Sequence, residues 1–329
     1  MNRRHLLSTL LSTSAALGIG AGYGGAAHAQ AFPSKSITLV VPFSAGGPTD
    51  RVARVLGEKL QEALGKPVVI DNKPGAGGQI AAQQIKQAPA DGHTVFVGAT
   101  EMFAINPTLY KKFSYDPFKD LLPVTTLAAM PMLLVVPPTS PVNSVADLVA
   151  AAKSKPKGVA FASQGTGSIG HLLGEMFHTK VGGNFVHIAY KGSAPALQDL
   201  MGGQVDMMFD VEPTSGPLVK TGKLKALAVA APKRMPTLPD VKTMAEAGFP
   251  GMDAGVWFAA AVKAGTPPEV VARLNEALVG VLKRPDVVKS FAEQGMATAP
   301  RSAAEFGSFM KSEAERWSAL VKSSGATVD

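Results

Sequence analysis

Three glycines in the stretch SQGTGSIGH, residues 163–171, form the G-x-G-x-x-G pattern of dinucleotide-binding loops. Apolar residues precede the stretch and a helical pattern follows it, which is the context that such a loop requires. A dinucleotide site also needs an Asp or Glu about 20 residues later to bind the ribose. Tyr190 and Lys191 stand there instead. The sequence therefore argues against NAD, and we expect no cofactor and a different anion at these glycines.

Ser168 and His171 are the side chains of this stretch that could catalyse hydrolysis. A nucleophile elbow has the pattern G-x-S-x-G, but Thr166 stands where its first glycine is required. His171 follows Ser168 by three residues on the same expected helix, and that spacing does not by itself bring a base to its nucleophile. An exported hydrolase built around Ser168 and His171 is the alternative to a binding protein. Turnover of esters by the purified protein would separate the two.

Metal chemistry finds little support in the sequence. The chain has no cysteine, and the histidines beyond the N-terminal segment are His93, His171, His178 and His187. His171 and His178 are seven residues apart, and neither has a histidine at the i,i+4 spacing of helical zinc sites. We therefore expect no metal.

A strand followed by a Gly/Ser/Thr loop and a helix start occurs three times, in residues 41–50, 162–171 and 189–196. At each helix start, free backbone N–H groups face the loop and the helix dipole adds partial positive charge. Small residues let an anion come close, and hydroxyl groups add donors. Three such loops without an adjacent acid, base or metal predict recognition of a carboxylate or phosphate without catalysis.

The first 29 residues have the features of an export signal. A basic start is followed by an apolar segment rich in Leu, Ala and Gly, and residues 27–29 match an A-x-A cleavage site. Arg3 and Arg4 leave twin-arginine export open beside the general secretory route. We expect cleavage after Ala29 and a periplasmic protein. The net charge of +7 is scattered and aromatic residues make up 6% of the chain, so we expect no nucleic-acid partner.

Apolar runs alternate with amphipathic helical patterns over residues 36–231, which indicates an α/β fold with parallel sheets. The C-terminal quarter has a mostly helical pattern, and residues 266–269 and 302–305 each match a capping box. Strands are expected at 36–43, 67–72, 93–99, 130–138, 158–163, 184–190, 205–210 and 224–231.

Motifs over essentially the whole mature chain resemble those of the Bug receptors, the substrate-binding proteins of tripartite tricarboxylate transporters in Gram-negative bacteria. They are PFSAGGPTDRVAR, VIDNKPGAGG, NPTLY, YDPFKDLLPVT, YKGSAPALQDLMGGQVDMMFD, LKALAVA, LPDVKTMAEAGFPG and GTPPEVVARLNEAL. The resemblance implies an α/β, two-lobed periplasmic binding protein of type II-like architecture. It would have two parallel or mixed sheets, helices on both faces and a hinge of two crossover segments. Lobe one would comprise residues 30–132 and 250–329, and lobe two residues 133–249.

The resemblance also implies a carboxylate held in the cleft between the lobes. In the family, contacts come from the loop after the first strand, from the GTGS-type helix start and from the cleft wall. The residues at these positions are Phe43, Ser44, Ala45, Gly46, Gly47, Asp50, Thr100, Glu101, Ser163, Gln164, Gly165, Thr166, Gly167, Ser168, Tyr190, Lys191, Gly192, Ala194 and Asp210.

Glu101 departs from the family pattern, because family members commonly carry a small or hydroxyl residue at this point. Two orientations are open. Glu101 either turns outward into solvent or faces the cleft, where a second ligand carboxylate would meet like charge. In the second case, an amine, hydroxyl or amide at that end of the ligand is favoured.

We thus expect a monomeric receptor that passes a small organic carboxylate to the membrane subunits of a tripartite tricarboxylate transporter. Dicarboxylates, aromatic acids, nicotinate-like acids and amino acids all fit the loops. A sensory role, in which the closed receptor docks on a signalling partner, is a further alternative that the sequence leaves open.

Overall fold

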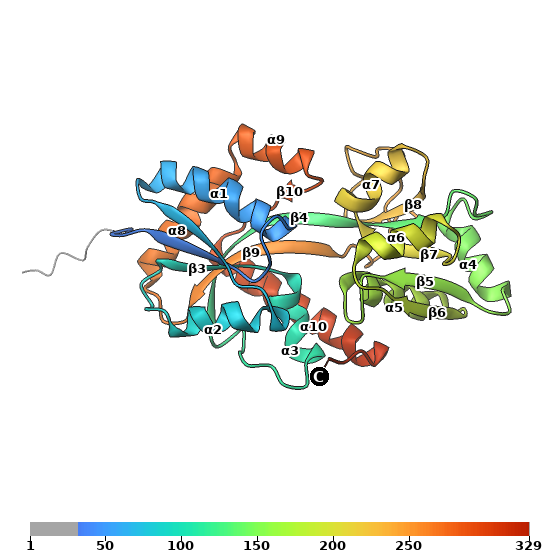
Figure 1. Ribbon diagram of the computed structural model, residues 1–329, viewed down its shortest axis with the longest axis horizontal. Coiled ribbons are helices and arrows are strands. Elements are labelled where there is room, and N and C mark those ends of the chain that lie inside the picture. The colour runs from blue at the N-terminus through green and yellow to red at the C-terminus, as the bar shows by residue number, and fades with distance from the viewer. Residues whose placement is uncertain (1–31, 329) are drawn as a thin grey trace, which may run out of the picture. The chain divides into compact units, whose positions relative to one another are not determined.

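Two groups of parallel strands, joined through long antiparallel strands, form the sheet of the computed structural model, which describes residues 32–328 (Figure 1). The predicted export signal and the expected cleavage site after Ala29 lie outside the described residues. The strands run in the order β2-β1-β3-β9-β4-β7-β5-β6, and β8 and β10 also pair with β4. The predicted α/β class with a mixed sheet is confirmed.

The first strand group contains β1 (Ile37–Val41), β2 (Val68–Asn72) and β3 (Thr94–Ala99). β1 pairs in parallel with both of its neighbours, so the carboxyl ends of all three strands lie at one edge. Helices α1 (Pro48–Leu64) and α2 (Gln79–Gln87) lie on opposite sides of these strands (Figure 1). Burial from both sides explains the almost continuous apolar run of β1.

The second strand group contains β5 (Val159–Ser163), β6 (Phe185–Ala189) and β7 (Met207–Val211). β5 pairs in parallel with β6 and with β7, which again places three carboxyl ends at one edge. Strand β8 (Lys225–Ala230) lies beside this group, where it pairs antiparallel with the last residues of β4. The remaining helices here are α4 (Val145–Ser154), α5 (Ile169–Val181), α6 (Ser193–Met201) and α7 (Glu212–Lys220).

Strand β4 (Leu121–Val136) connects the two groups together with β9. Its first part pairs antiparallel with β9 (Gly255–Lys263), and its last residues pair with β7 and β8. The sequence predicted only the second half, because Pro123 and two register shifts interrupt the pattern of the first half. β9 lies in the quarter for which the sequence indicated mostly helix, so that expectation missed a central strand.

The C-terminal segment supplies three helices and a short strand, which are α8 (Pro268–Leu282), α9 (Pro285–Glu293), β10 (Ala297–Thr298) and α10 (Ala303–Ser324). Ser302 and Glu305 form the predicted capping box at the start of α10. The capping box predicted at residues 266–269 is wrong. Pro267 is the N-cap of α8, and the Thr266 hydroxyl donates to the backbone carbonyl of Lys263 instead.

Three short elements follow the first strand group, namely η1 (Ala76–Gly78), the π-helical η2 (Glu101–Ile105) and α3 (Asn106–Leu109). An aromatic cluster fixes η2, because Phe103 stacks on Trp257 of β9 at 5.6 Å between ring centroids. Both Trp257 and Trp317 of α10 donate their indole N–H to one buried oxygen of Glu313, each over 3.0 Å. This shared acceptor ties β9 to α10. None of the described helices is long and apolar enough to cross a membrane.

Two glycine-to-alanine substitutions test how tightly α5 packs. A Cβ at Gly174 of α5 would lie 2.3 Å from the buried Phe161 ring, whereas a Cβ at Gly280 of α8 meets nothing within 4 Å. We expect Gly174→Ala to destabilise the protein by about 1–3 kcal/mol through overpacking. Gly280→Ala should stabilise it by roughly 0.5–1 kcal/mol through helix propensity. Urea unfolding of both variants measures this, and changes of equal sign would contradict the packing described here.

Candidate functional site

Five predicted site segments lie at the carboxyl ends of the parallel strands. The first loop (residues 43–47) follows β1, and Glu101 follows β3 at the same edge. The second loop (residues 163–168) begins at the last residue of β5, the third loop (residues 190–194) follows β6, and Asp210 belongs to the end of β7. Ligand sites of open α/β sheets occur at such edges.

The first loop leads directly into α1. Its N-cap is Gly47, which has no side chain to occupy the N–H groups of the first turn, and residues 44–46 are exposed. Gly46 takes a positive φ of 85° there, a conformation that glycine adopts without steric cost. The first turn of α1 therefore has no capping side chain, and the loop lies at the positive end of the α1 dipole. Phe43 is half-buried, and its carbonyl accepts a hydrogen bond from Asn72 over 3.0 Å.

Asp50 lies beneath the first loop and is 1% exposed. Its carboxylate accepts hydrogen bonds from the backbone N–H of Gly46, from Arg54 and from Asn72, at 2.8, 2.8 and 3.0 Å respectively. Burial acts to raise the pKa of Asp50, but these hydrogen bonds outweigh it and hold the pKa below its ordinary value. The ionised carboxylate thus fixes the loop from below.

The second loop leads into α5. Ser168 is the N-cap, and its hydroxyl accepts from the backbone N–H of His171 over 3.2 Å. Gly165 and Gly167 take positive φ values of 139° and 77°, and Thr166 between them is exposed. The Ser168 hydroxyl donates to Gln164, while the Nδ1 of His171 accepts from the Gly167 N–H over 3.0 Å. Ser168 and the His171 ring therefore have separate partners and do not form the dyad of the hydrolase alternative.

Asp210 supports the second loop as Asp50 supports the first. It is fully buried, and it accepts from Gln164 over 2.8 Å, from Ser193 over 2.6 Å and from the Thr214 hydroxyl. These donors come from the second loop, α6 and α7, so one carboxyl group connects three segments. Burial raises the pKa of Asp210, and the three hydrogen bonds oppose that rise.

The third loop contacts the second through the backbone. The N–H groups of Tyr190 and Gly192 donate to the carbonyls of Ser163 and Gln164, each over 3.1 Å. The Tyr190 hydroxyl donates to Asp199 over 2.7 Å, so its polar end points to α6. Lys191 and Ala194 are exposed.

A stacked histidine pair lies under the second loop. The rings of His171 and His187 are 3.8 Å apart between centroids, and the Ser163 hydroxyl lies 2.7 Å from the Nε2 of His187. Burial lowers the pKa of His171 to about 4, and the neighbouring His187 adds to this effect. His171 is thus neutral at pH 7, which leaves its Nδ1 free to accept from Gly167.

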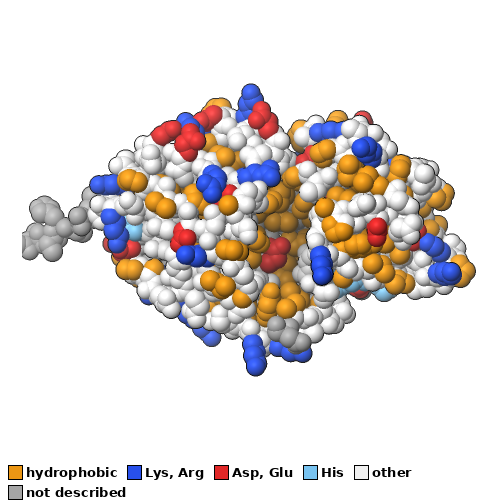
Figure 2. Space-filling model, viewed as in Figure 1, with side chains coloured by type: hydrophobic (Ala, Val, Ile, Leu, Met, Phe, Trp, Pro, Cys, Tyr) orange, Lys and Arg blue, Asp and Glu red, His pale blue; other side chains and the backbone are white. Residues whose placement is uncertain are grey.

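The second loop contacts α3, which continues from η2. A Cβ at Gly167 would lie 2.5 Å from a methyl carbon of Leu109, so the backbone and that side chain are in close contact. This contact brings the segment that begins at Glu101 to the same region as the second loop. On this face, hydrophobic side chains gather in a hollow between the two strand groups, with acidic side-chain atoms among them (Figure 2).

Glu101 is not a solvated surface carboxylate, which was one of the two orientations expected. Part of the residue remains exposed, but its Oε2 is buried and has no hydrogen-bond partner among residues 32–328. Burial raises its pKa. Thr100 beside it is fully buried, and its hydroxyl pairs with the backbone of Trp257. Thr100 therefore supports the site from behind.

The sequence missed several residues that organise these loops. Asn72, His187 and Thr214 each bond to a predicted site residue or its backbone. Asn72 ends β2, within the motif VIDNKPGAGG, so its place at the carboxyl edge was a usable signal. The other two carried none, because their partners lie 24 and 4 residues away in separate elements.

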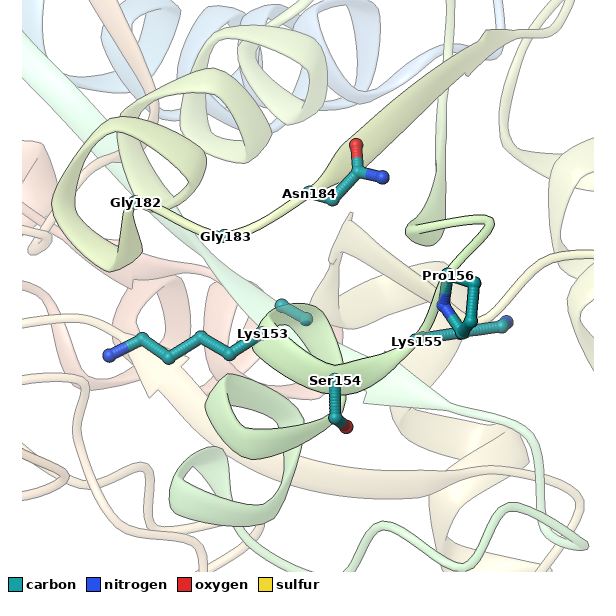
Figure 3. Close-up of a pocket in the computed structure, with 8 residues that line it drawn as sticks. Lys153, Ser154, Lys155, Pro156, Gly182, Gly183 and Asn184 are labelled. Atoms are coloured by element: carbon teal, nitrogen blue, oxygen red, sulfur yellow. The ribbon is translucent and has the colours of Figure 1, made fainter.

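Two other hollows of the described residues lie away from these loops. One of about 450 Å³ opens at the amino ends of β5 and β6, where the lining side chains come from the ends of α4 and α5 (Figure 3). Another of about 520 Å³ lies between α3 and α10. No cluster of three metal-ligating side chains occurs within residues 32–328.

Comparison with known proteins gives consistent matches. Residues 52–326 match the protein family described as "Tripartite tricarboxylate transporter family receptor". The chain is 36% identical to Protein BugT of Bordetella pertussis, over 99% of both chains. It is similar to the solved structure of "R. palustris Rpa4515 with adipate", at 38% identity, TM-score 0.77 and coverage of 90% and 100%. It also resembles MatC from Rhodopseudomonas palustris with bound malate, at 34% identity, TM-score 0.72 and coverage of 88% and 100%.

Fold, loops and matches together define the class of the protein, which is a solute-binding receptor of the periplasmic type and not an enzyme. Within that class, the chain belongs to the tripartite tricarboxylate transporter receptor family.

The neutral His171 predicts a pH dependence of stability. Its pKa in the folded protein, about 4, lies below the ordinary value of 6.5. Its contribution is therefore complete above pH 6.5 and is lost as the pH falls towards 4, because the unfolded chain binds the proton more readily. We expect a loss of about 2 kcal/mol between pH 7 and pH 4.5 from this residue. His171→Asn retains an acceptor near Nδ1 and does not titrate, so its unfolding free energy should vary less with pH. Parallel pH profiles for the two proteins would refute this role.

Proposed function

We propose that the protein is a periplasmic receptor that captures a small organic carboxylate and delivers it to the membrane subunits of a tripartite transporter. In this proposal, cleavage after Ala29 releases a monomer. The ligand lies between lobe one, residues 30–132 and 250–329, and lobe two, residues 133–249. The first and second loops bind its carboxylate from the two sides.

The observation that carries the proposal concerns both loops. The first loop leads into an open helix N-terminus, the second loop has an exposed hydroxyl, and a buried aspartate lies beneath each of them. The carboxylates of Asp50 and Asp210 are occupied by internal donors, which hold the loops in place and leave residues 44–46 and the Thr166 hydroxyl exposed to an anion. Helix starts of this kind stabilise carboxylates through N–H groups and the dipole. The adipate and malate of the two R. palustris structures belong to the same ligand class, which supports the proposal.

The exposed Thr166 provides a direct test. Thr166→Val keeps the shape of the side chain and deletes the hydroxyl, while Thr166→Ser keeps the hydroxyl as the control. A hydrogen bond to a charged group contributes about 1.5–3 kcal/mol. The affinity for a bound carboxylate should therefore fall roughly 10- to 100-fold in Thr166→Val alone.

The measurement starts from a thermal-shift panel of adipate, malate, benzoate and nicotinate, followed by calorimetry on the best member. A ligand at 100 times its dissociation constant raises the apparent stability by about 2.7 kcal/mol. NAD serves as the negative probe and should give no shift. Equal affinities of the wild-type and Thr166→Val proteins would remove Thr166 from the site.

Closure between the lobes is a separate expectation. If loops from both lobes bind one ligand, the binding free energy favours a closed arrangement. Small-angle scattering should then give a smaller radius of gyration at saturating ligand than without ligand. The same ligand concentration with Thr166→Val, where occupancy is lower, should compact the protein less. A radius that stays constant through saturation of the wild-type protein would contradict the two-lobe mechanism.

A further inference from the structure

Glu101 sits on a rigid support. The buried hydroxyl of Thr100 accepts from the backbone N–H of Trp257 over 2.8 Å. The Tyr115 hydroxyl donates to the carbonyl of Met102 over 2.7 Å, and Phe103 packs between the rings of Trp257 and Phe306. These contacts fix the residues on both sides of Glu101, so its place at the end of β3 is set by the core.

The Glu101 carboxyl group differs from those of Asp50, Asp210 and Glu313, which are also buried. Asp50 and Asp210 each accept from three donors, and Glu313 accepts from two indole groups. Glu101 takes part in no ion pair of residues 32–328, and its buried Oε2 has no hydrogen-bond partner there. A buried oxygen without a donor costs free energy that a bound donor would recover.

The position of Glu101 relates it to both loops. It shares the carboxyl edge with the first loop, because β1 and β3 are parallel neighbours. It opens η2, which runs into α3, and Leu109 of α3 contacts Gly167 in the second loop. A ligand whose carboxylate is bound by the loops therefore has its other end within the region that Glu101 borders.

Resting on the proposed carboxylate-receptor function, we infer that Glu101 selects the ligand by binding an N–H or O–H donor at the end opposite the ligand carboxylate. An ammonium group fits best, because it supplies a donor and an opposite charge together. A second carboxylate offers acceptors only and repels the charged form of Glu101. The predicted ligand is thus a carboxylic acid with a distal ammonium, amide or hydroxyl group, and dicarboxylates are disfavoured.

Matched ligands test this inference without knowledge of the natural ligand. Each set keeps one skeleton and changes the distal group from carboxylate to amide to amine. The probes are succinate, succinamate and 4-aminobutanoate; adipate, its monoamide and 6-aminohexanoate; and terephthalate, its monoamide and 4-(aminomethyl)benzoate. Calorimetry at pH 7.5 compares the wild-type protein with Glu101→Gln. Glu293→Gln removes an exposed carboxylate of α9 by the same substitution and serves as the control.

We expect the wild-type and Glu293→Gln proteins to bind the amine or amide of one set about 10-fold or more tightly than its dicarboxylate. In Glu101→Gln, the affinity for the amine should fall roughly 10- to 100-fold and that for the dicarboxylate should rise. A merely structural role would weaken all members alike and leave their ratio unchanged, and that result would overturn the inference. A wild-type preference for the dicarboxylate would also overturn it. Failure of the wild-type protein to bind any carboxylate of the three sets would instead reject the proposed receptor function.

Discussion

A buried aspartate beneath each glycine-rich loop is the constraint on which the site depends. A loop of small residues has many conformations in the unfolded chain, so its fixed shape must be stabilised by contacts outside the loop. Asp50 supplies these contacts through Gly46 and Asn72, and Asp210 supplies them through Gln164 and Ser193. Because both carboxylates accept hydrogen bonds from inside the protein, the loops keep their shape and leave residues 44–46 and Thr166 exposed.

A small number of helices and strands in the core hold the first and second loops in position. β4 pairs with β7 of the second group and with β9, which pairs with β3 of the first group, and the aromatic cluster around Trp257 fixes β9, η2 and α10 to one another. The Glu313 carboxylate that bridges Trp257 and Trp317 gives both indole N–H groups a partner where water is absent. The end of β3, and with it Glu101, therefore has a position set by the core.

The sequence predicted most strands and the loops but not the polar groups that organise them. Runs such as those of β1 and β5 are short and apolar, which made them recognisable. β9 was missed because its small apolar residues, mostly alanine and valine, also suit a helix. The capping box expected at Thr266 failed because Pro267 changes the local backbone at the helix start. The stacking of His171 on His187 depends on tertiary structure, since the two residues belong to α5 and β6.

The close approach of Gly167 to Leu109 limits how this receptor can diversify. Position 167 needs a positive φ and has no space for a β-carbon, so two independent requirements restrict it to glycine. A lineage that acquires a new ligand therefore has little freedom in the second loop itself. Exposed positions such as Ser44, Ala45 and Thr166 have room for other side chains. In the proposed receptor, the glycine at position 167 thus confines adjustment of the second loop to the side chains around it.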